Sequence, residues 1–240
     1  MVINPAIGPI ELSHYFYRGR YLDTNPGTPF VTSGIAISSL NILSGHLNGT
    51  NGFYIYDPFC GNGVLLACAV MVLKGRIKGV YASDISNEAC RTTAANLERI
   101  CTRAGRERFF GAMSRRRQRT YADLIEYLTD MEDVPFLVGI ADASNCDQVR
   151  AVLDGNRINL VVTDPPYGNM SDFCSGESGT SDEVMGIGAS MQVVHGHMAK
   201  KSHVLMFTGT RIPRRCTPDG YHRVDYQEIG RRNLHILQRQ

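Results

Sequence analysis

Short apolar segments alternate with helical segments along most of this chain, and this alternation restricts its fold more than any other feature. Strand-like apolar runs lie at 53–56, 80–83, 135–140, 158–163 and 203–208, and two further strands are expected around 221–227 and 233–238. Helical patterns fall between them, at 31–47, 64–74, 87–104, 149–153 and 184–200. Strands that alternate with helices usually form parallel sheets. The sequence therefore predicts an α/β fold with a mostly parallel seven-stranded sheet and helices on both faces.

One segment interrupts this rhythm. About 30 residues separate the predicted helix at 87–104 from the predicted strand at 135–140, which is more than a simple connection needs. This stretch is rich in arginine and continues into an amphipathic pattern at 121–128. We expect a single domain over 1–240, with an N-terminal extension at 1–47 and a helical basic insertion at about 105–130. Inserted charged segments of this kind are candidates for substrate binding.

Positive charge is concentrated in two places, although the whole chain carries a net charge of only +2. Residues 101–120 contain seven arginines and one glutamate, and residues 209–240 contain seven arginines and three acidic residues. Two basic segments on a near-neutral protein favour a polyanionic partner such as RNA. A codon bias toward arginine explains the same composition equally well.

Other classes of protein are excluded or made unlikely by simple patterns. The longest apolar run, 64–73, is far shorter than the ~20 residues that cross a bilayer, so no membrane contact is expected. The seven cysteines form no CxxC pair, and the first residues lack signal-peptide character, which favours reduced thiols and a cytoplasmic location. His195 and His197 have no third ligand nearby, so no metal is expected.

Three aspartates, Asp57, Asp84 and Asp142, follow three successive predicted strands. In an open α/β sheet, ligands bind outside the carboxyl ends of the strands. Each aspartate alone is typical of a helix cap or a turn. Together, one carboxylate for each loop favours a ligand with hydroxyls, amines and a positive centre.

The glycine loop after the first strand has the sequence Gly61-Asn-Gly63. A dinucleotide site is excluded because the third glycine is absent and Asp57 would repel a pyrophosphate. A P-loop is excluded because no Gly-Lys-Ser/Thr follows. A sulfonium nucleoside fits better: the glycines allow close approach of a methionine moiety, Asp84 is placed for ribose hydroxyls, and Asp142 is placed for an adenine amino group.

The most specific motif is Asp164-Pro-Pro-Tyr167, directly after the apolar run 158–163. Pro165 and Pro166 fix the backbone and remove two N–H donors, so the neighbouring carbonyls are rigid acceptors. A carboxylate and a carbonyl can hold an N–H group of a planar substrate, and Tyr167 offers a ring for stacking. The alternative for these residues is a simple turn.

These motifs resemble the Rossmann-like class I S-adenosylmethionine-dependent methyltransferases, and in particular the AviRa-type 23S rRNA (guanine) methyltransferases of orthosomycin (avilamycin) resistance. The similarity includes Tyr17-Arg-Gly-Arg20, Pro26-Gly-Thr-Pro29-Phe30, the glycine loop, Ala82-Ser-Asp84, the basic insertion and the Asp164 motif. It implies catalytic roles for residues 164–167 and RNA contacts from the basic insertion and from Tyr17–Arg20. The implied cofactor residues are Asp57, Pro58, Phe59, Cys60, Gly61, Gly63, Asp84, Ile85, Asp142 and Ala143. The implied RNA-binding residues are Tyr17, Arg18, Arg20, Arg106, Arg108, Arg115, Arg116, Arg117 and Arg119.

The expected reaction is methylation of a guanine nitrogen in 23S rRNA, with S-adenosyl-L-homocysteine as the second product. A flipped guanine would stack on Tyr167 and present N1 or N2, with Asp164 or water as the base for N1–H. The alternatives are another nitrogen substrate (tRNA guanine, DNA adenine or protein glutamine) and an RNA-binding scaffold without activity. A monomer is the favoured oligomeric state.

Overall fold

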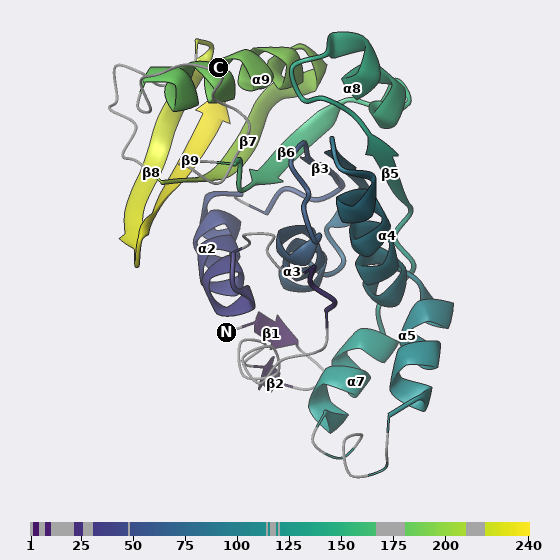
Figure 1. Ribbon diagram of the computed structural model, residues 1–240. Helices are drawn as coiled ribbons and strands as arrows, with labels where there is room; N and C mark the ends of the chain where they lie inside the picture. Colours follow the sequence, from purple (N-terminus) through teal and green to yellow (C-terminus); the bar gives the residue numbers. More distant parts are fainter. Residues whose placement is uncertain are drawn as a thin grey trace.

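Figure 1 shows the computed structural model of the chain. The structure describes residues 2–4, 8–10, 22–25, 31–47, 49–113, 115, 119, 121–166, 181–209 and 219–240. The predicted site residues Tyr17, Arg18, Arg20, Arg116, Arg117 and Tyr167 lie outside these ranges.

The core of the fold is a seven-stranded sheet with the order β5-β4-β3-β6-β7-β9-β8. The strands are β3 (Phe53–Asp57), β4 (Ile77–Asp84), β5 (Phe136–Ile140), β6 (Ile158–Thr163), β7 (Met198–Thr208), β8 (Tyr221–Ile229) and β9 (Arg232–Arg239). A separate antiparallel pair consists of β1 (Val2–Asn4) and β2 (Gly8–Ile10).

The expectation of a mostly parallel sheet needs correction, because the sheet is mixed. The neighbouring pairs from β5 to β7 are parallel, but β7·β9 and β9·β8 are antiparallel. The reason is the tight turn after Ile229, where Gly230 has φ +65° and returns the chain as a hairpin. A hairpin necessarily pairs its strands antiparallel. The hairpin places β9 between β7 and β8 and brings the start of β9 to the carboxyl end of β7.

Helices cover both faces of the sheet, as the sequence predicts (Figure 1). One core layer packs α2 (Ser33–His46), α3 (Val64–Val72) and α4 (Asn87–Cys101) on the sheet, and the other packs α8 (Cys146–Leu153) and α9 (Ser181–His197). Successive residues of a strand point to opposite faces. Ile55 accordingly belongs to the first layer and Tyr56 to the second.

The predicted helix at 87–104 is two helices, α4 and α5 (Arg103–Gly111), which meet at Thr102. The Thr102 hydroxyl caps the second helix by accepting a hydrogen bond from the Gly105 N–H at 2.9 Å. A side chain on Gly105 would come within 2.1 Å of the Glu98 carbonyl oxygen, so the break also requires glycine there. The segment expected as a helical insertion contains the helices α5 and α7 (Ala122–Thr129).

The start of β7 also differs from the boundary that the sequence predicts. The helical pattern at 184–200 predicts a strand from 203, whereas α9 ends at His197 and β7 begins at Met198. Lys201 has φ +60°, and the pairing with β6 shifts between Ile158 and Leu160. The extra residues of β7 extend it past this irregularity to pair with the first residue of β6.

Candidate active site

Four aspartates lie at the carboxyl ends of four neighbouring strands of the sheet. Asp84 and Asp57 are the last residues of β4 and β3, Asp164 directly follows β6, and Asp142 lies two residues after β5. The sheet order β5-β4-β3-β6 places these strands side by side. The structure thus brings together the acidic residues that the sequence predicts for the cofactor and the substrate.

The glycine loop is fixed by contacts on two sides. The Gly61 N–H donates to Asp84 Oδ2 at 3.0 Å, and Thr93 Oγ1 donates to the Gly61 carbonyl oxygen at 2.9 Å. Gly63 has φ +69° at the N-terminus of α3, and a Cβ there would lie 2.9 Å from the Thr93 side chain. Only glycine meets both requirements. The loop therefore presents bare backbone at the edge of the sheet, next to the free N–H groups of a helix N-terminus.

Asp57 is buried at the centre of the site. Its Oδ1 accepts hydrogen bonds from the Phe59 N–H at 3.0 Å and from Thr163 Oγ1 at 2.8 Å. Burial raises the pKa of Asp57 to about 8, despite the two donors, and the neighbouring carboxylates of Asp164 and Asp84 add to the rise. A positively charged ligand next to this carboxyl would favour its ionised form.

Asp164 has two oxygens in different surroundings. Oδ2 accepts a hydrogen bond from Arg232 Nη1 in an ion pair, and both side chains are largely buried. Oδ1 is buried and accepts no hydrogen bond from the residues that the structure describes. Burial raises the pKa of Asp164, and Arg232 opposes this rise. Pro165 is buried and Pro166 is half-buried, so the start of the motif packs against the protein directly after β6.

Arg232 is a site residue that reasoning from sequence missed. It lies 68 residues after Asp164, and its only signal was membership of the basic C-terminal segment. No local pattern distinguishes it from Arg231, which is exposed. The pairing of β9 with β7 decides which of the two arginines reaches the site.

A second missed element is the segment 22–25, which packs against the glycine loop. The Asn25 N–H donates to Asn62 Oδ1 at 3.0 Å. Asn96 Nδ2 donates to the Asn62 carbonyl oxygen at 2.7 Å and also to the Asp23 carbonyl oxygen at 2.9 Å. Asn62 is buried, and its Nδ2 has no acceptor among the described residues. Within the described part of the chain, the Asn62 Nδ2 group is thus a buried donor without a partner next to the glycines.

The remaining predicted cofactor residues occupy varied positions. Ile85 directly follows Asp84 and is 76% exposed, which is unusual for a large apolar side chain. Asp142 is exposed and accepts hydrogen bonds from the N–H and the hydroxyl of Ser144. The other members, Pro58, Cys60 and Ala143, are buried, while Phe59 is half-buried.

These features fit a sulfonium nucleoside with a methionine portion. Among the described residues the Asn62 Nδ2 group has no acceptor, so it can donate to a carboxylate, and an ionised Asp57 carboxyl suits a nearby cation. Ile85 offers an exposed apolar side chain beside Asp84, as a nucleoside base would require. Both oxygens of Asp84 hold backbone N–H groups, yet each carboxylate oxygen has a further lone pair for a hydroxyl.

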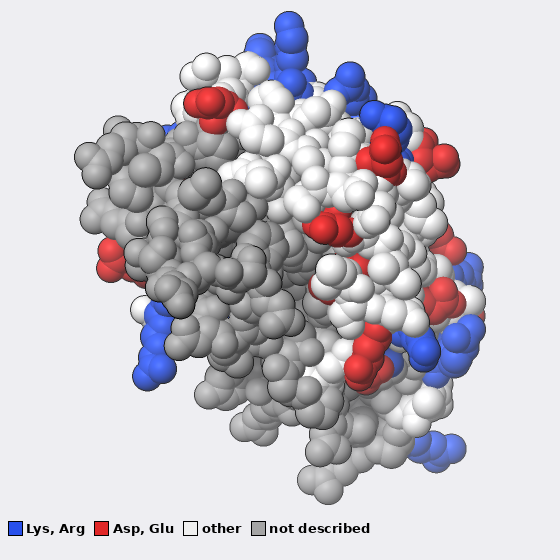
Figure 2. All heavy atoms as spheres, turned by 45° about the horizontal axis from the view of Figure 1, so that its top comes forward, with Lys and Arg blue, Asp and Glu red and all other residues white. Residues whose placement is uncertain are grey.

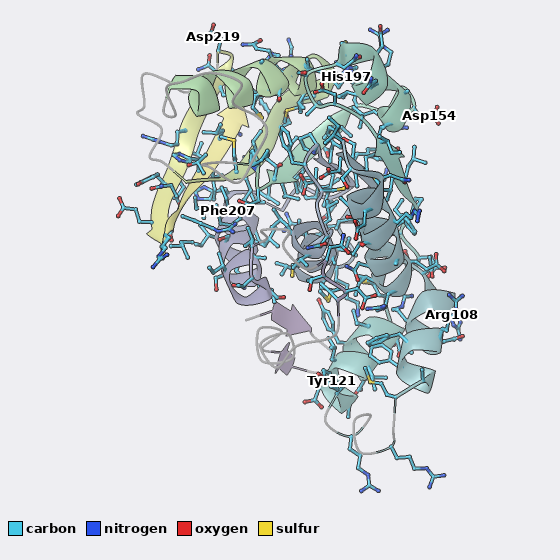
Figure 3. The ribbon with its side chains drawn as sticks, in the orientation of Figure 1. Arg108, Tyr121, Asp154, His197, Phe207 and Asp219 are labelled. Carbon is cyan, nitrogen blue, oxygen red and sulfur yellow. The ribbon has the colours of Figure 1, made fainter. Side chains whose placement is uncertain are left out.

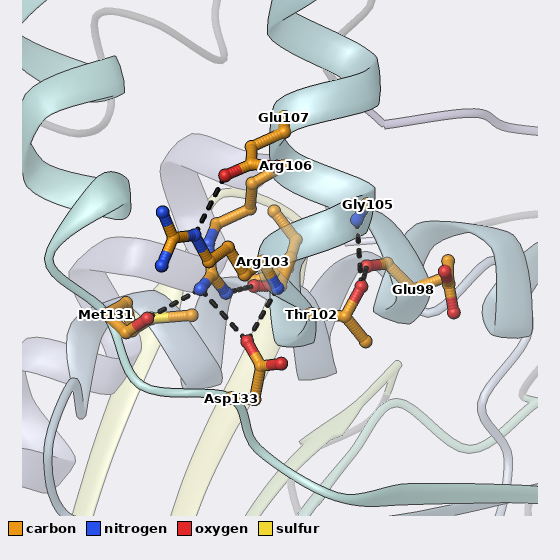
Figure 4. A network of polar contacts seen from close by, with 9 residues as sticks. Glu98, Thr102, Arg103, Gly105, Arg106, Glu107, Met131 and Asp133 are labelled. Atoms are coloured by element: carbon orange, nitrogen blue, oxygen red, sulfur yellow. Dashed lines mark hydrogen bonds and ion pairs between the residues drawn. The ribbon is translucent and has the colours of Figure 1, made fainter.

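One predicted RNA-binding residue of the basic insertion, Arg106, is buried in the structure. Arg106 is only 3% exposed, and its guanidinium donates to the carbonyl oxygens of Ile100 and Met131 (Figure 4). It also pairs with Asp133 at 3.2 Å. Arg106 therefore fastens α5 to the chain between α7 and β5, and the expectation that it contacts RNA is wrong.

The other described arginines of the insertion are exposed, namely Arg108, Arg115 and Arg119. Figure 3 places Arg108 and Tyr121 at the end of the molecule formed by α5 and α7, away from α9 and His197. On the face seen in Figure 2, basic and acidic side chains are mixed, and the described residues form no continuous basic surface there. The insertion therefore offers three exposed cations among its described arginines, and Arg108 lies at the end of the molecule formed by α5 and α7 (Figure 3).

No helix in the ranges that the structure covers is long and apolar enough to span a membrane. Within the same ranges, no three or more His, Cys, Asp or Glu side chains are grouped in a way that could hold a metal ion.

Comparison with known proteins gives consistent matches. A family model described as rRNA methyltransferase AviRa matches residues 14–232. A 23S rRNA (guanine(2535)-N(1))-methyltransferase of Streptomyces viridochromogenes is 27% identical over 166 residues, which span 65% of this chain and 66% of that relative, just under two thirds of its length.

The solved structures extend the match to the fold of nearly the whole chain. A structure of rRNA methyltransferase AviRa from S. viridochromogenes superposes with a TM-score of 0.75 at 21% identity and covers 99% of this chain and 96% of that one. A structure of TrmN from Thermus thermophilus gives a TM-score of 0.53 at 15% identity, over 88% of this chain and 49% of that one.

Proposed function

Since the chain belongs to the AviRa family of rRNA methyltransferases, we propose that it methylates N1 of a guanine in 23S rRNA, with S-adenosylmethionine as the methyl donor. The observation that carries the proposal is the Asp164 carboxylate. One of its oxygens is held by Arg232, and the other is buried beside the predicted cofactor site with no hydrogen-bond partner among the described residues. This is the acceptor that a base with an N–H group needs.

The choice of guanine N1 rests on chemistry and on the relative. The relative from S. viridochromogenes is named for guanine N1 methylation in 23S rRNA. Guanine N1 carries a proton, so its lone pair becomes available only when a base accepts that proton. A carboxylate such as Asp164 can do this, whereas the exocyclic N2 has no such requirement before attack. Membership of an enzyme family also removes the scaffold alternative.

The ten predicted cofactor residues, together with Asn62, are proposed to hold the cofactor. Asp57, Asn62 and the glycine loop would bind the methionine portion, Asp84 the ribose, and Ile85, Asp142 and Ala143 the adenine. Pro58, Phe59 and Cys60 complete the loop around it. When bound, the cofactor supplies a methyl group that is already activated by a sulfonium. The protein therefore contributes mainly alignment and a proton acceptor.

The substrate base is proposed to leave its stack and enter the pocket at residues 164–167. Asp164 and the Pro165 carbonyl accept hydrogen bonds from the guanine edge, Pro166 keeps the backbone rigid, and Tyr167 stacks on the ring. Alignment of the nitrogen with the methyl group follows from these contacts.

RNA outside the pocket is proposed to contact the basic insertion and the N-terminal extension. The residues are Arg108, Arg115, Arg116, Arg117 and Arg119, together with Tyr17, Arg18 and Arg20. We further propose a monomer that acts in the cytoplasm, where the ribosomal substrate lies, and a role in resistance to orthosomycin antibiotics.

The experiment that tests this function is methyl transfer from labelled S-adenosylmethionine. Purified 23S rRNA, 16S rRNA, tRNA and plasmid DNA are assayed in parallel, with D164A as the control. Label in 23S rRNA alone supports the proposal, and label in tRNA or DNA overturns the substrate. Reverse transcription then locates the modified atom, since a methyl group on N1 blocks base pairing and stops extension, whereas one on N2 does not.

A further inference from the structure

The ion pair between Arg232 and Asp164 joins two residues that the sheet separates by one strand. Asp164 follows β6, Arg232 begins β9, and β7 lies between these strands. The exposed fractions of the two side chains are 16% and 14%. A largely buried charge pair at the end of a central strand carries a large desolvation penalty, because both ions lose most of their hydration. A purely structural contact would not need two charged groups there.

The backbone of Arg232 is held in place by the hairpin on which it lies. The next residue, Asn233, accepts a hydrogen bond from Tyr226 Oη at 2.7 Å and donates from Nδ2 to the Gly209 carbonyl oxygen at 3.3 Å. These contacts fasten the start of β9 to β8 and to the end of β7. Arg232 is thus supplied by a paired strand rather than by a loop.

This geometry makes the two oxygens of Asp164 unequal. Oδ2 is occupied by Arg232, whereas Oδ1 is buried and accepts no hydrogen bond from any residue in the described ranges. A buried acceptor without a donor is costly, and a substrate N–H group would satisfy it. We infer that Arg232 is a positioning residue for the methylation: it fixes the carboxylate through Oδ2, so that Oδ1 accepts the proton of the substrate N–H. This inference rests on the proposed function and assigns a role within it.

Arg232 affects the reaction because Asp164 must be ionised to accept the proton of guanine N1. As the bond between N1 and the methyl carbon forms, the N1 proton moves to Oδ1, and the carbon–sulfur bond breaks with its electron pair remaining on sulfur. Oδ1 can accept the proton only while Asp164 is ionised. Burial opposes this ionisation, and Arg232 on β9 favours it. The Asp57 carboxyl on β3 also lies near Asp164, and the Asp164 charge adds to the rise in the pKa of Asp57. Without Arg232, Asp164 would be protonated over a wider range of pH.

The test compares R232Q with the matched control R231Q, which removes the neighbouring exposed arginine. Methylation rates at saturating RNA and cofactor are measured from pH 5.5 to 9. An adjacent arginine lowers the pKa of an aspartate by about one to three units. For R232Q we therefore expect the acidic limb of the rate profile to shift upward by about that amount, with a loss of tenfold or more at pH 6 that largely recovers at high pH. R232K retains the charge and should keep the limb near its wild-type position, while R231Q should leave it unchanged.

A second measurement does not depend on catalysis. Carboxyl ¹³C NMR titration of aspartate-labelled protein, with the Asp164 signal assigned by D164N, should show its midpoint at higher pH in R232Q than in wild type. A rate profile for R232Q that parallels wild type at every pH, with an unmoved Asp164 titration, would overturn the inference. If wild-type protein methylates no guanine in 23S rRNA, the proposed function fails instead, and the NMR result still decides whether Arg232 controls Asp164.

Discussion

The Thr163 hydroxyl donates a 2.8 Å hydrogen bond to the Asp57 carboxylate, and it thereby joins the end of β6 to the end of β3. Thr163 immediately precedes Asp164, and both it and Asp57 are buried. The two halves of the proposed site are thus connected by one hydroxyl.

The first prediction concerns the Thr163 hydroxyl itself. T163V keeps the shape of the side chain but removes a donor that lowers the pKa of Asp57. A hydrogen bond to a charged group contributes about 1.5–3 kcal/mol, so cofactor affinity at pH 7.5 should fall by about tenfold or more. Calorimetry of S-adenosylmethionine binding measures this, and T163S, which keeps the hydroxyl, should bind nearly as well as wild type. Equal affinity for T163V and T163S would show that the hydroxyl does not act on Asp57.

Cofactor affinity should also depend on pH through Asp57. Its pKa of about 8 keeps the carboxyl protonated at neutral pH in the ligand-free protein. A cationic ligand favours the carboxylate, so binding releases a proton, and affinity should rise with pH up to about 8 and then level off. Asn cannot titrate, so D57N should bind more weakly and lose the pH dependence. Calorimetry in buffers of different ionisation enthalpy counts the released proton, and a count of zero in wild type at pH 7 would contradict the prediction.

Gly63 and Gly75 form a matched pair for testing the glycine loop. Both have positive φ, +69° and +75°, but a Cβ at Gly63 would meet Thr93 at 2.9 Å, whereas one at Gly75 meets nothing within 4 Å. G75A should lose only the ~1–2 kcal/mol of left-handed strain. G63A should lose more stability and most of its cofactor affinity, because the loop must move. Urea denaturation and calorimetry check this, and equal behaviour of the two variants would argue against a packed loop.

Arg106 and Arg108 separate a structural arginine from an exposed one. R106M leaves the buried Ile100 and Met131 carbonyl oxygens without their donor, and each unsatisfied buried acceptor typically costs about 1–3 kcal/mol. The Arg108 side chain is 74% exposed and lies 3.9 Å from Glu98, so R108A should change stability by less than ~0.5 kcal/mol. Urea denaturation of the two variants measures the difference. Similar midpoints would mean that the buried network contributes little.

The basic insertion should control RNA affinity without affecting the cofactor. Reversing the charges of Arg115, Arg116 and Arg117 removes phosphate contacts, so RNA binding should weaken strongly and its dependence on salt should become shallower. Filter binding at several salt concentrations measures both quantities, with calorimetry of the cofactor as the control. Unchanged RNA affinity would mean that another surface docks the substrate.

Much of this protein was determined by the sequence alone. The strand β6 has the predicted bounds, and the aspartates at the carboxyl ends of β3, β4, β5 and β6 lie on the same side of the sheet, because apolar runs and their neighbouring turns are local signals. The glycine loop and the Asp164-Pro-Pro motif could be recognised in the same way. Each depends on residues that are close together in the chain.

Only the tertiary structure decided which distant residues meet. Arg106 has the same sequence character as Arg108, yet the packing of α5 against the chain before β5 buries one and exposes the other. Arg232 reaches Asp164, and Arg231 remains exposed, because β9 returns antiparallel beside β7. Asn96 is tied to Asn62 by a contact that crosses 34 residues. Such pairings depend on strand order, register and helix packing, and these are set by the burial of the whole core, which local patterns do not encode.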